Sequence, residues 1–260
     1  MTSETVRATS FGAAAGEYDR YRVGVPDEVV DRLLPGGVDA VLDLGAGTGA
    51  MTRRLVGRAA KVYAVDPDTR MLSVLAEGCP EAETHEGTAE RIPLPDDAVD
   101  AVVVASAWHW MDPDAALPEL ARVLRPGGKL VLVWNRRDRT VPWVADLEEA
   151  RKRITGGDDY VDERIRYFMA EPWLPDAARF GRVETADIRW DAELTKEEIA
   201  RLMTTYGSFI SAPEDRKPEM LRELIDYVHA DERVAPAEDR EDALVALPMV
   251  CHMWRATVTG

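Results

Sequence analysis

The apolar positions in the first half of the chain form short runs that alternate with longer amphipathic segments. The runs are typical of buried strands, and the segments carry apolar residues at helical spacing. The predicted strands are Ala40–Leu44, Lys61–Val65, Thr84–Gly87, Asp100–Ala105 and Leu130–Trp134. The predicted helices are Asp27–Leu34, Thr48–Ala59, Asp68–Gly78 and Ala115–Leu124. This alternation predicts an α/β fold with a parallel, doubly wound sheet, in which ligands bind beyond the carboxyl ends of the strands.

After Asn135 the alternation ends. A polar loop, Arg136–Arg139, precedes four predicted helices, which are Val141–Arg153, Asp162–Met169, Thr195–Phe209 and Pro218–His229. The third of these helices opens with Thr195 and Glu198, a capping-box pattern. Two further strands are predicted at Val183–Trp190 and Leu247–Val258. We therefore divide the chain into an arm with a helix (1–37), a ligand-binding core (38–135), helical cap insertions (136–182 and 192–245) and closing strands (183–191 and 246–260).

The charge of the chain narrows the classes of partner. Its 260 residues include 48 acidic and 32 basic side chains, and the formal net charge is −16. Phosphate backbones and anionic membranes repel such a surface, so we expect neither nucleic acid nor membrane as a partner. Cys79 and Cys251 lie far apart and the first ten residues carry no apolar run. We expect a cytoplasmic protein with no disulfide framework and no metal site.

The segment Val41–Gly49 carries the clearest chemistry. Glycines at positions 45, 47 and 49 follow a strand and open a helix, a turn that lets a ligand approach the backbone closely. Taken alone, the run also matches the dinucleotide fingerprint Gly45-x-Gly47-x-x-Ala50. Asp43 favours another ligand, because a carboxylate there would repel a pyrophosphate and attract a cationic ammonium group. The methionine end of S-adenosylmethionine carries such a group.

At this point the chain resembles the class I S-adenosylmethionine-dependent methyltransferases. The resemblance continues, in the family's order and spacing, through Val62–Asp68, Gly87–Glu90, Ile92–Asp96 and Arg122–Leu130. It implies a Rossmann-like, seven-stranded sheet with the order 3-2-1-4-5-7-6 and an antiparallel last strand. It also implies S-adenosylmethionine as the cofactor.

The resemblance implies a role for each matching residue. Asp43 would meet the methionine ammonium, Asp66 would accept hydrogen bonds from the ribose hydroxyls, and Met71 would pack on the adenine. The wall of the cofactor site would be formed by Gly45, Ala46, Gly47 and Gly49. Further cofactor contacts are expected from Tyr21, Pro67, Thr88, Ala89, Glu90 and Ala105. Family members often carry Asp where this chain has Thr88.

A narrower resemblance, to the trans-aconitate methyltransferases, rests on Ala107–Trp110, Trp134–Asn135, Tyr206–Ile210 and Leu247–Arg255. It implies a small-molecule methyl acceptor. We expect O-methylation in preference to N- or C-methylation by a narrow margin. The alternatives are an NAD(P)-dependent oxidoreductase that shares the glycine loop, a catalytically silent cofactor-binding protein, and an enzyme that modifies a macromolecule.

The acceptor side of the site has several candidates. His109 follows the fourth strand, where acceptor and sulfonium would meet, and is a candidate general base. The alternative is a structural histidine packed between two tryptophans. Trp108 and Trp134 are candidates for an apolar wall around the acceptor, with core packing as the alternative.

Polar candidates for the acceptor site follow the fifth strand and lie in the predicted cap. Arg136, with Arg137 and Arg139, could clamp a carboxylate of the acceptor, because a guanidinium group matches that geometry. The alternative is a solvated loop. Tyr206 lies in the inserted helices, where a lid over the acceptor is expected.

Overall fold

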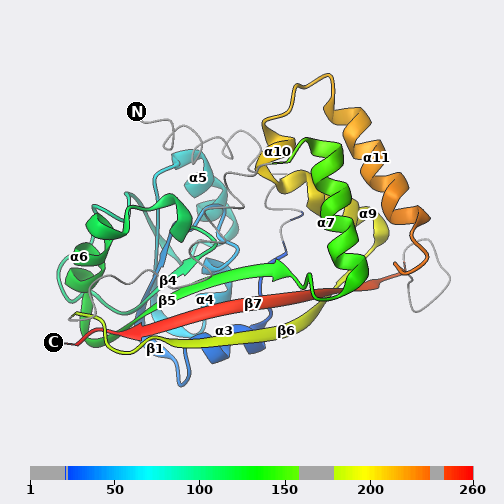
Figure 1. Ribbon diagram of the computed structural model, residues 1–260. Coiled ribbons are helices and arrows are strands. Elements are labelled where there is room, and N and C mark those ends of the chain that lie inside the picture. The colour runs from blue at the N-terminus through cyan, green and yellow to red at the C-terminus, as the bar shows by residue number, and fades with distance from the viewer. Residues whose placement is uncertain (1–20, 22, 158–178, 235–242, 260) are drawn as a thin grey trace.

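The computed structural model describes residues 21, 23–157, 179–234 and 243–259, and Figure 1 shows how they are arranged. Within these residues one seven-stranded sheet has the order β3-β2-β1-β4-β5-β7-β6. The strands are β1 (Val38–Leu44), β2 (Ala59–Asp66), β3 (Glu83–Glu86), β4 (Val99–Ala105), β5 (Leu124–Arg137), β6 (Glu184–Leu194) and β7 (Val245–Thr257). Strands β3, β2, β1, β4 and β5 are parallel, and β7 is antiparallel to both β5 and β6. The expected doubly wound order, with its antiparallel last strand, is confirmed.

The helices fall into two groups along the chain. Those before β5 are α3 (Asp27–Leu33), α4 (Thr52–Leu55), α5 (Thr69–Gly78), the 3-10 helix η2 (Trp108–Trp110) and α6 (Pro113–Val123). Those after β5 are α7 (Pro142–Thr155), α9 (Lys196–Leu202), the 3-10 helix η3 (Met203–Thr205), α10 (Gly207–Ile210) and α11 (Lys217–Ala230). Figure 1 shows α7, α9, α10 and α11 gathered at one end of the long strands β5, β6 and β7. We call this second group the cap.

Both faces of the central strands are buried, as the unbroken valine run of β4 predicts. Val102 packs in one hydrophobic cluster with Leu42 of β1, and Val103 packs in another with Val41. All four side chains are inaccessible to solvent. Because successive side chains of a strand point to opposite faces, apolar groups must cover the sheet on both sides.

The cap has an apolar core that joins it to the sheet. Leu147 of α7, Ile199 of α9 and Leu224 of α11 pack in one cluster with Met249 of β7. Arg137, the last residue of β5, pairs with Met249 in the sheet. Since β5 runs parallel to β4 and β1, the cap lies at the carboxyl ends of the parallel strands, where ligands bind in open α/β sheets.

The helix predicted over Thr48–Ala59 is much shorter in the structure, where α4 covers only Thr52–Leu55. The residues before it form the glycine turn, and Gly57, with a φ of 82°, ends the helix region. Strand β2 then begins at Ala59. The spacing of the apolar residues gave no sign that Gly49 and Gly57 would adopt a left-handed backbone. Only one helical turn fits between these two glycines.

The fifth strand is longer than the predicted Leu130–Trp134, because antiparallel pairing with β7 continues to Arg137. The residues expected in a polar loop therefore begin inside the sheet. The helix predicted over Thr195–Phe209 is confirmed at its start, where the capping box of Thr195 and Glu198 is present. It then divides into α9, η3 and α10. Tyr206, whose extended backbone has a ψ of 149°, separates η3 from α10.

Some expectations lie outside the described residues. These are the helix Asp162–Met169 and the arm before residue 21. Among the helices that the structure does describe, none combines the length and the apolar character needed to cross a bilayer.

We expect Gly45→Ala to destabilise the fold more than Gly57→Ala. Both glycines have a positive φ, of 73° and 82°, so both variants introduce backbone strain of about 1–2 kcal/mol. A Cβ at Gly45 would also lie 2.6 Å from Cβ of Ala107, whereas a Cβ at Gly57 would meet nothing within 4 Å. Urea denaturation measures the difference, and equal losses in the two variants would contradict the steric account.

Candidate active site

The end of β1 is fastened to β2 through the backbone of the glycine turn. The amides of Gly45 and Ala46 both donate to the carbonyl oxygen of Val65, at 2.8 and 3.1 Å. A third bond joins the turn to the next residue of β2, because the amide of Gly47 donates to Oδ2 of Asp66 at 2.9 Å. The turn is therefore held against the carboxyl edge of the sheet before any ligand is considered.

The three glycines of the turn differ in what surrounds them. A Cβ at Gly49 would lie 2.7 Å from Cγ of Leu75, and the clash at Gly45 is equally close. These two glycines let the turn pack against η2 and α5. A Cβ at Gly47 would meet nothing within 4 Å. There is thus open space beside Gly47, where the turn offers its backbone.

Asp43 is fully buried just before the turn. Its Oδ2 accepts a hydrogen bond from the Thr52 hydroxyl at 2.6 Å, and its Oδ1 has no hydrogen-bond partner. Burial raises the pKa of this carboxyl group to about 7, the Thr52 bond acts against that rise, and the charge of Asp66 adds to it. A buried carboxylate with an unsatisfied oxygen is a group that a cationic ligand would stabilise.

Asp66, at the end of β2, is nearly buried and holds two loops together. Besides the bond from Gly47, its Oδ1 accepts from the amide of Asp68 at 2.8 Å. Burial raises the pKa of Asp66, and these two backbone bonds oppose the rise. Each carboxylate oxygen can accept more than one hydrogen bond, so the group retains capacity for ribose hydroxyls. Pro67, which follows it, is exposed.

The residues expected near the adenine lie in α5, in the segment after β3 and at the end of β4. Met71 and Ala89 are buried, and Thr88 is exposed. Glu90 accepts from the amide of Asp112 at 3.0 Å. Ala105, at the end of β4, is half-buried.

Three residues of this region were missed by sequence reasoning. Thr52 binds Asp43, but a threonine nine positions after an aspartate forms no recognised pattern. Ser106 follows β4 with a φ of 55°, a conformation that non-glycine residues rarely adopt. Arg122 donates to the carbonyl oxygens of Ile92 and Leu94, at 3.0 and 2.8 Å, and so holds the loop beside the expected adenine site.

The tryptophans considered as a wall of the acceptor site are almost completely buried in the protein core. Trp108 and Trp134 are 1% and 2% exposed and belong to a main hydrophobic cluster of the sheet. Trp134 packs edge-on against Trp254, with 5.0 Å between ring centroids. His109 is also buried, and its ring lies 4.6 Å from that of Trp110. The structure places Trp108 and Trp134 in the core, which is the packing alternative.

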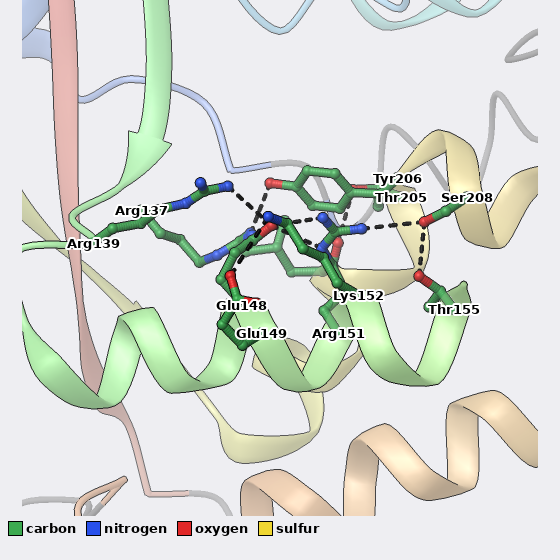
Figure 2. A network of polar contacts seen from close by, with 11 residues as sticks. Arg137, Arg139, Glu148, Glu149, Arg151, Lys152, Thr155, Thr205, Tyr206 and Ser208 are labelled. Atoms are coloured by element: carbon green, nitrogen blue, oxygen red, sulfur yellow. Dashed lines mark hydrogen bonds and ion pairs between the residues drawn. The ribbon is translucent and has the colours of Figure 1, made fainter. Parts of the chain in front are cut away.

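The arginines after Trp134 do not form the solvated loop considered from the sequence. Arg136 and Arg137 are the last residues of β5, so their side chains leave the strand on opposite faces. Arg137 is buried, and its Nη1 donates to the hydroxyl of Tyr206 at 2.7 Å. Arg137 and Arg139 both contact Glu148 of α7, as Figure 2 shows. Arg136 leaves the strand on the other face and is half-buried.

Tyr21 is the first residue of the chain that the structure describes. The guanidinium carbon of Arg201, on α9, lies 5.6 Å from the centroid of its ring. Tyr21 therefore approaches the cap, which is also the carboxyl side of the sheet.

Comparison with known proteins identifies the family of the chain. The family model of the methyltransferase domain matches residues 42–132. An uncharacterized methyltransferase of Mycobacterium tuberculosis is 44% identical over 250 residues, which cover 96% of each chain. The chain belongs to this methyltransferase family. The nicotinamide-dependent oxidoreductase considered from the sequence is thereby set aside.

Solved structures agree with the fold. A protein of Anaeromyxobacter dehalogenans, provisionally assigned as a type II methyltransferase, superimposes with a TM-score of 0.67 at 20% identity, covering 92% of this chain and 98% of that one. Haemonchus contortus phospholethanolamine N-methyltransferase 2, solved with S-adenosylhomocysteine, gives a TM-score of 0.55 at 14% identity, covering 100% and 61%. Family membership and fold together support S-adenosylmethionine as the cofactor of this methyltransferase.

We expect the buried carboxyl group of Asp43 to make stability fall as pH rises. The unfolded chain releases this proton near pH 3.8, whereas the folded protein retains it up to about pH 7. In that window the folded state binds more protons, so raising the pH favours unfolding, by a few kcal/mol at most for a shift of about three pKa units.

Urea denaturation between about pH 4 and pH 8 tests this expectation. Asp43→Asn should flatten the decline, and Asp39→Asn, an exposed position on the same strand, should leave it unchanged. If both variants follow the wild-type profile, Asp43 is not the titrating group.

Proposed function

We propose that this protein transfers a methyl group from S-adenosylmethionine to a small-molecule acceptor, with oxygen preferred as the methylated atom. The observation that carries the proposal is the buried carboxylate of Asp43, whose Oδ1 has no partner, beside a glycine turn with open space at Gly47. An ammonium group suits this corner and a pyrophosphate does not, because the corner already holds two buried carboxylates.

The residues at the corner fit the cofactor in charge and in shape. Asp43 would stabilise the amino group of the methionine portion, and Asp66 would accept from the ribose hydroxyls. Gly47 leaves room for the cofactor to approach the backbone. When bound, S-adenosylmethionine supplies a methyl group made electrophilic by its sulfonium. The chain's own task is to orient donor and acceptor in line and to exclude water.

The cap is the feature that favours a small acceptor. Its helices lie at the carboxyl ends of the parallel strands, and its apolar cluster fastens them to β7. Helices inserted over that edge restrict the size of a partner that can reach the cofactor. The net charge of −16 also disfavours nucleic acid as the acceptor. The narrower assignment to a branch like the trans-aconitate methyltransferases is part of this proposal.

The choice of acceptor atom decides whether a base is needed. A carboxylate oxygen is already a nucleophile, whereas a hydroxyl must lose its proton during the transfer. His109, in η2 directly after β4, is the candidate for that base. Its burial beside Trp110 keeps it away from bulk water, which suits proton transfer within a closed site.

Titration calorimetry with S-adenosylhomocysteine tests the cofactor site. We expect saturable binding by the full chain, at least about tenfold weaker binding by Asp43→Asn, because a charge-assisted contact is lost, and unchanged binding by Asp39→Asn. NAD should give no saturable heat. Failure of the full chain to bind S-adenosylhomocysteine would overturn the proposed function.

Methyl transfer to a panel of small carboxylates, alcohols and amines tests the role of His109. We expect His109→Gln to lower kcat for hydroxyl acceptors by roughly 100-fold, and to leave carboxylate acceptors near the wild-type rate. The affinity for S-adenosylhomocysteine serves as the control for folding. Equal effects on both acceptor classes would assign His109 a packing role.

A further inference from the structure

A group of three arginines surrounds one carboxylate in the cap, as Figure 2 shows. Glu148 of α7 contacts Arg137 of β5 and lies 3.0 Å from Nη2 of Arg139. Its Oε1 also accepts two bonds from Arg151 of the same helix, from Nε at 3.0 Å and from Nη2 at 2.6 Å. We call these four residues the arginine cluster.

The positive charge of the arginine cluster exceeds its negative charge. The side chains of Arg137, Arg151 and Glu148 are 5%, 2% and 1% exposed, and that of Arg139 is 39% exposed. Across the described part of the chain, Glu148 is the acid that the ion pairs of these three arginines share. Among the described residues, the buried arginines Arg137 and Arg151 thus share one carboxylate, and Arg139 adds a third, partly exposed, positive charge. Burying an uncompensated charge costs several kcal/mol.

Two neutral side chains also contact the buried arginines of the cluster. Tyr206 lies against both buried arginines, whose guanidinium carbons are 4.9 Å (Arg137) and 4.5 Å (Arg151) from the centroid of its ring. The hydroxyl of Ser208 accepts from Arg151 at 3.1 Å. Such contacts orient guanidinium groups but do not cancel their charge. The Nε of Arg137 is buried and has no hydrogen-bond partner, so one charged donor is left unsatisfied.

The excess charge persists at all ordinary pH values. Burial alone would raise the pKa of Glu148, but the charges of Arg137, Arg151 and Arg139 outweigh burial and hold it well below its usual range. Arginines do not lose their protons in proteins. Among the described residues the cluster therefore keeps three cations and one anion, a net charge of +2 that an additional anion would reduce.

The position of the cluster connects it with the glycine turn. Arg137 ends β5, and β5 is parallel to β4 and β1. The arginine cluster and the carboxylate of Asp43 thus lie at the same edge of the sheet. The cluster is at the cap, and Asp43 is at the proposed cofactor site. A molecule that receives a methyl group must approach this edge.

We propose that the arginine cluster binds an oxyanion of the methyl acceptor, a carboxylate or a phosphate group. Guanidinium groups match both oxyanions in geometry and charge. The proposal rests on the proposed function, because it assigns the anion to the acceptor. The anion would first contact Arg139, the exposed member of the cluster. Arg137 would supply the buried Nε as a donor.

Calorimetric titration of the full chain with citrate and with inorganic phosphate, at constant ionic strength, tests the binding. We expect saturable binding of at least one probe, weakened about tenfold by Arg139→Gln. Arg153→Gln, an exposed arginine on the same helix as Arg151, is the matched control and should bind as the wild type does. Binding of citrate alone or phosphate alone identifies the oxyanion. Saturable binding of neither, or an equal loss in the control, overturns the proposal.

A second variant removes the negative charge of the cluster instead of a positive one. Glu148→Gln removes the anion that the three arginines share, so we expect a lower Tm and a larger rise in Tm on adding the bound probe than in the wild type. A purely structural ion-pair cluster would lose Tm without this increased response. If Glu148→Gln responds to the probe no more than Arg153→Gln does, an anion site is contradicted.

Turnover separates this proposal from the proposed function. For a pair of acceptors that differ only as acid and amide, Arg139→Gln should raise KM for the acid about tenfold and leave KM for the amide and the affinity for S-adenosylhomocysteine unchanged. Normal cofactor binding with unchanged KM for the acid defeats the cluster proposal and leaves the methyltransferase intact. Loss of cofactor binding in the wild type defeats the proposed function instead.

Discussion

A single buried carboxylate, Asp43 at the end of β1, is the constraint on which the proposed cofactor site depends. It is fully buried beside the glycine turn. The hydroxyl of Thr52 donates a hydrogen bond to one of its two oxygens, and the other oxygen has no partner among the described residues. Burial of a carboxylate with a free oxygen is unfavourable in the protein alone. A cation would make the arrangement favourable, which is the basis of our proposal that the ammonium end of S-adenosylmethionine binds here. The ties of the turn to Val65 and Asp66 keep the corner in place.

The cap presents the opposite electrostatic situation at the same edge of the sheet. Arg137 and Arg151 are buried around Glu148, and the cations outnumber the anion. A donor whose one end is cationic and an acceptor whose one end is anionic would each compensate a different buried charge. Under these proposals the protein would be most stable with both molecules bound. With the donor alone the excess charge of the arginine cluster would stay uncompensated, and with the acceptor alone the carboxylate of Asp43 would.

Much of the cofactor site follows from short-range patterns. Gly45, Gly47 and Asp66 lie next to strand ends that the hydrophobic pattern identifies, and the parallel topology brings those ends together. The resemblance to the class I methyltransferases implied the sheet order, which the structure confirms. By contrast, Trp108 and Trp134 share their sequence neighbourhood with the site but pack in the core. A side chain's position in the sequence does not reveal which face of a turn or strand it leaves.

The sequence by itself determined the strand–helix alternation, the capping box at Thr195 and the corner of Asp43 with its glycines, because each depends on residues close together in the chain. Only the tertiary structure decided which arginines meet. Arg137 ends β5, Arg139 follows it, Arg151 lies in α7, and Tyr206 comes from a separate insertion. Their meeting depends on the extra residues of β5 that pair with β7 and on the packing of α7 against α9 and α11. These are long-range contacts, and no local spacing encodes them.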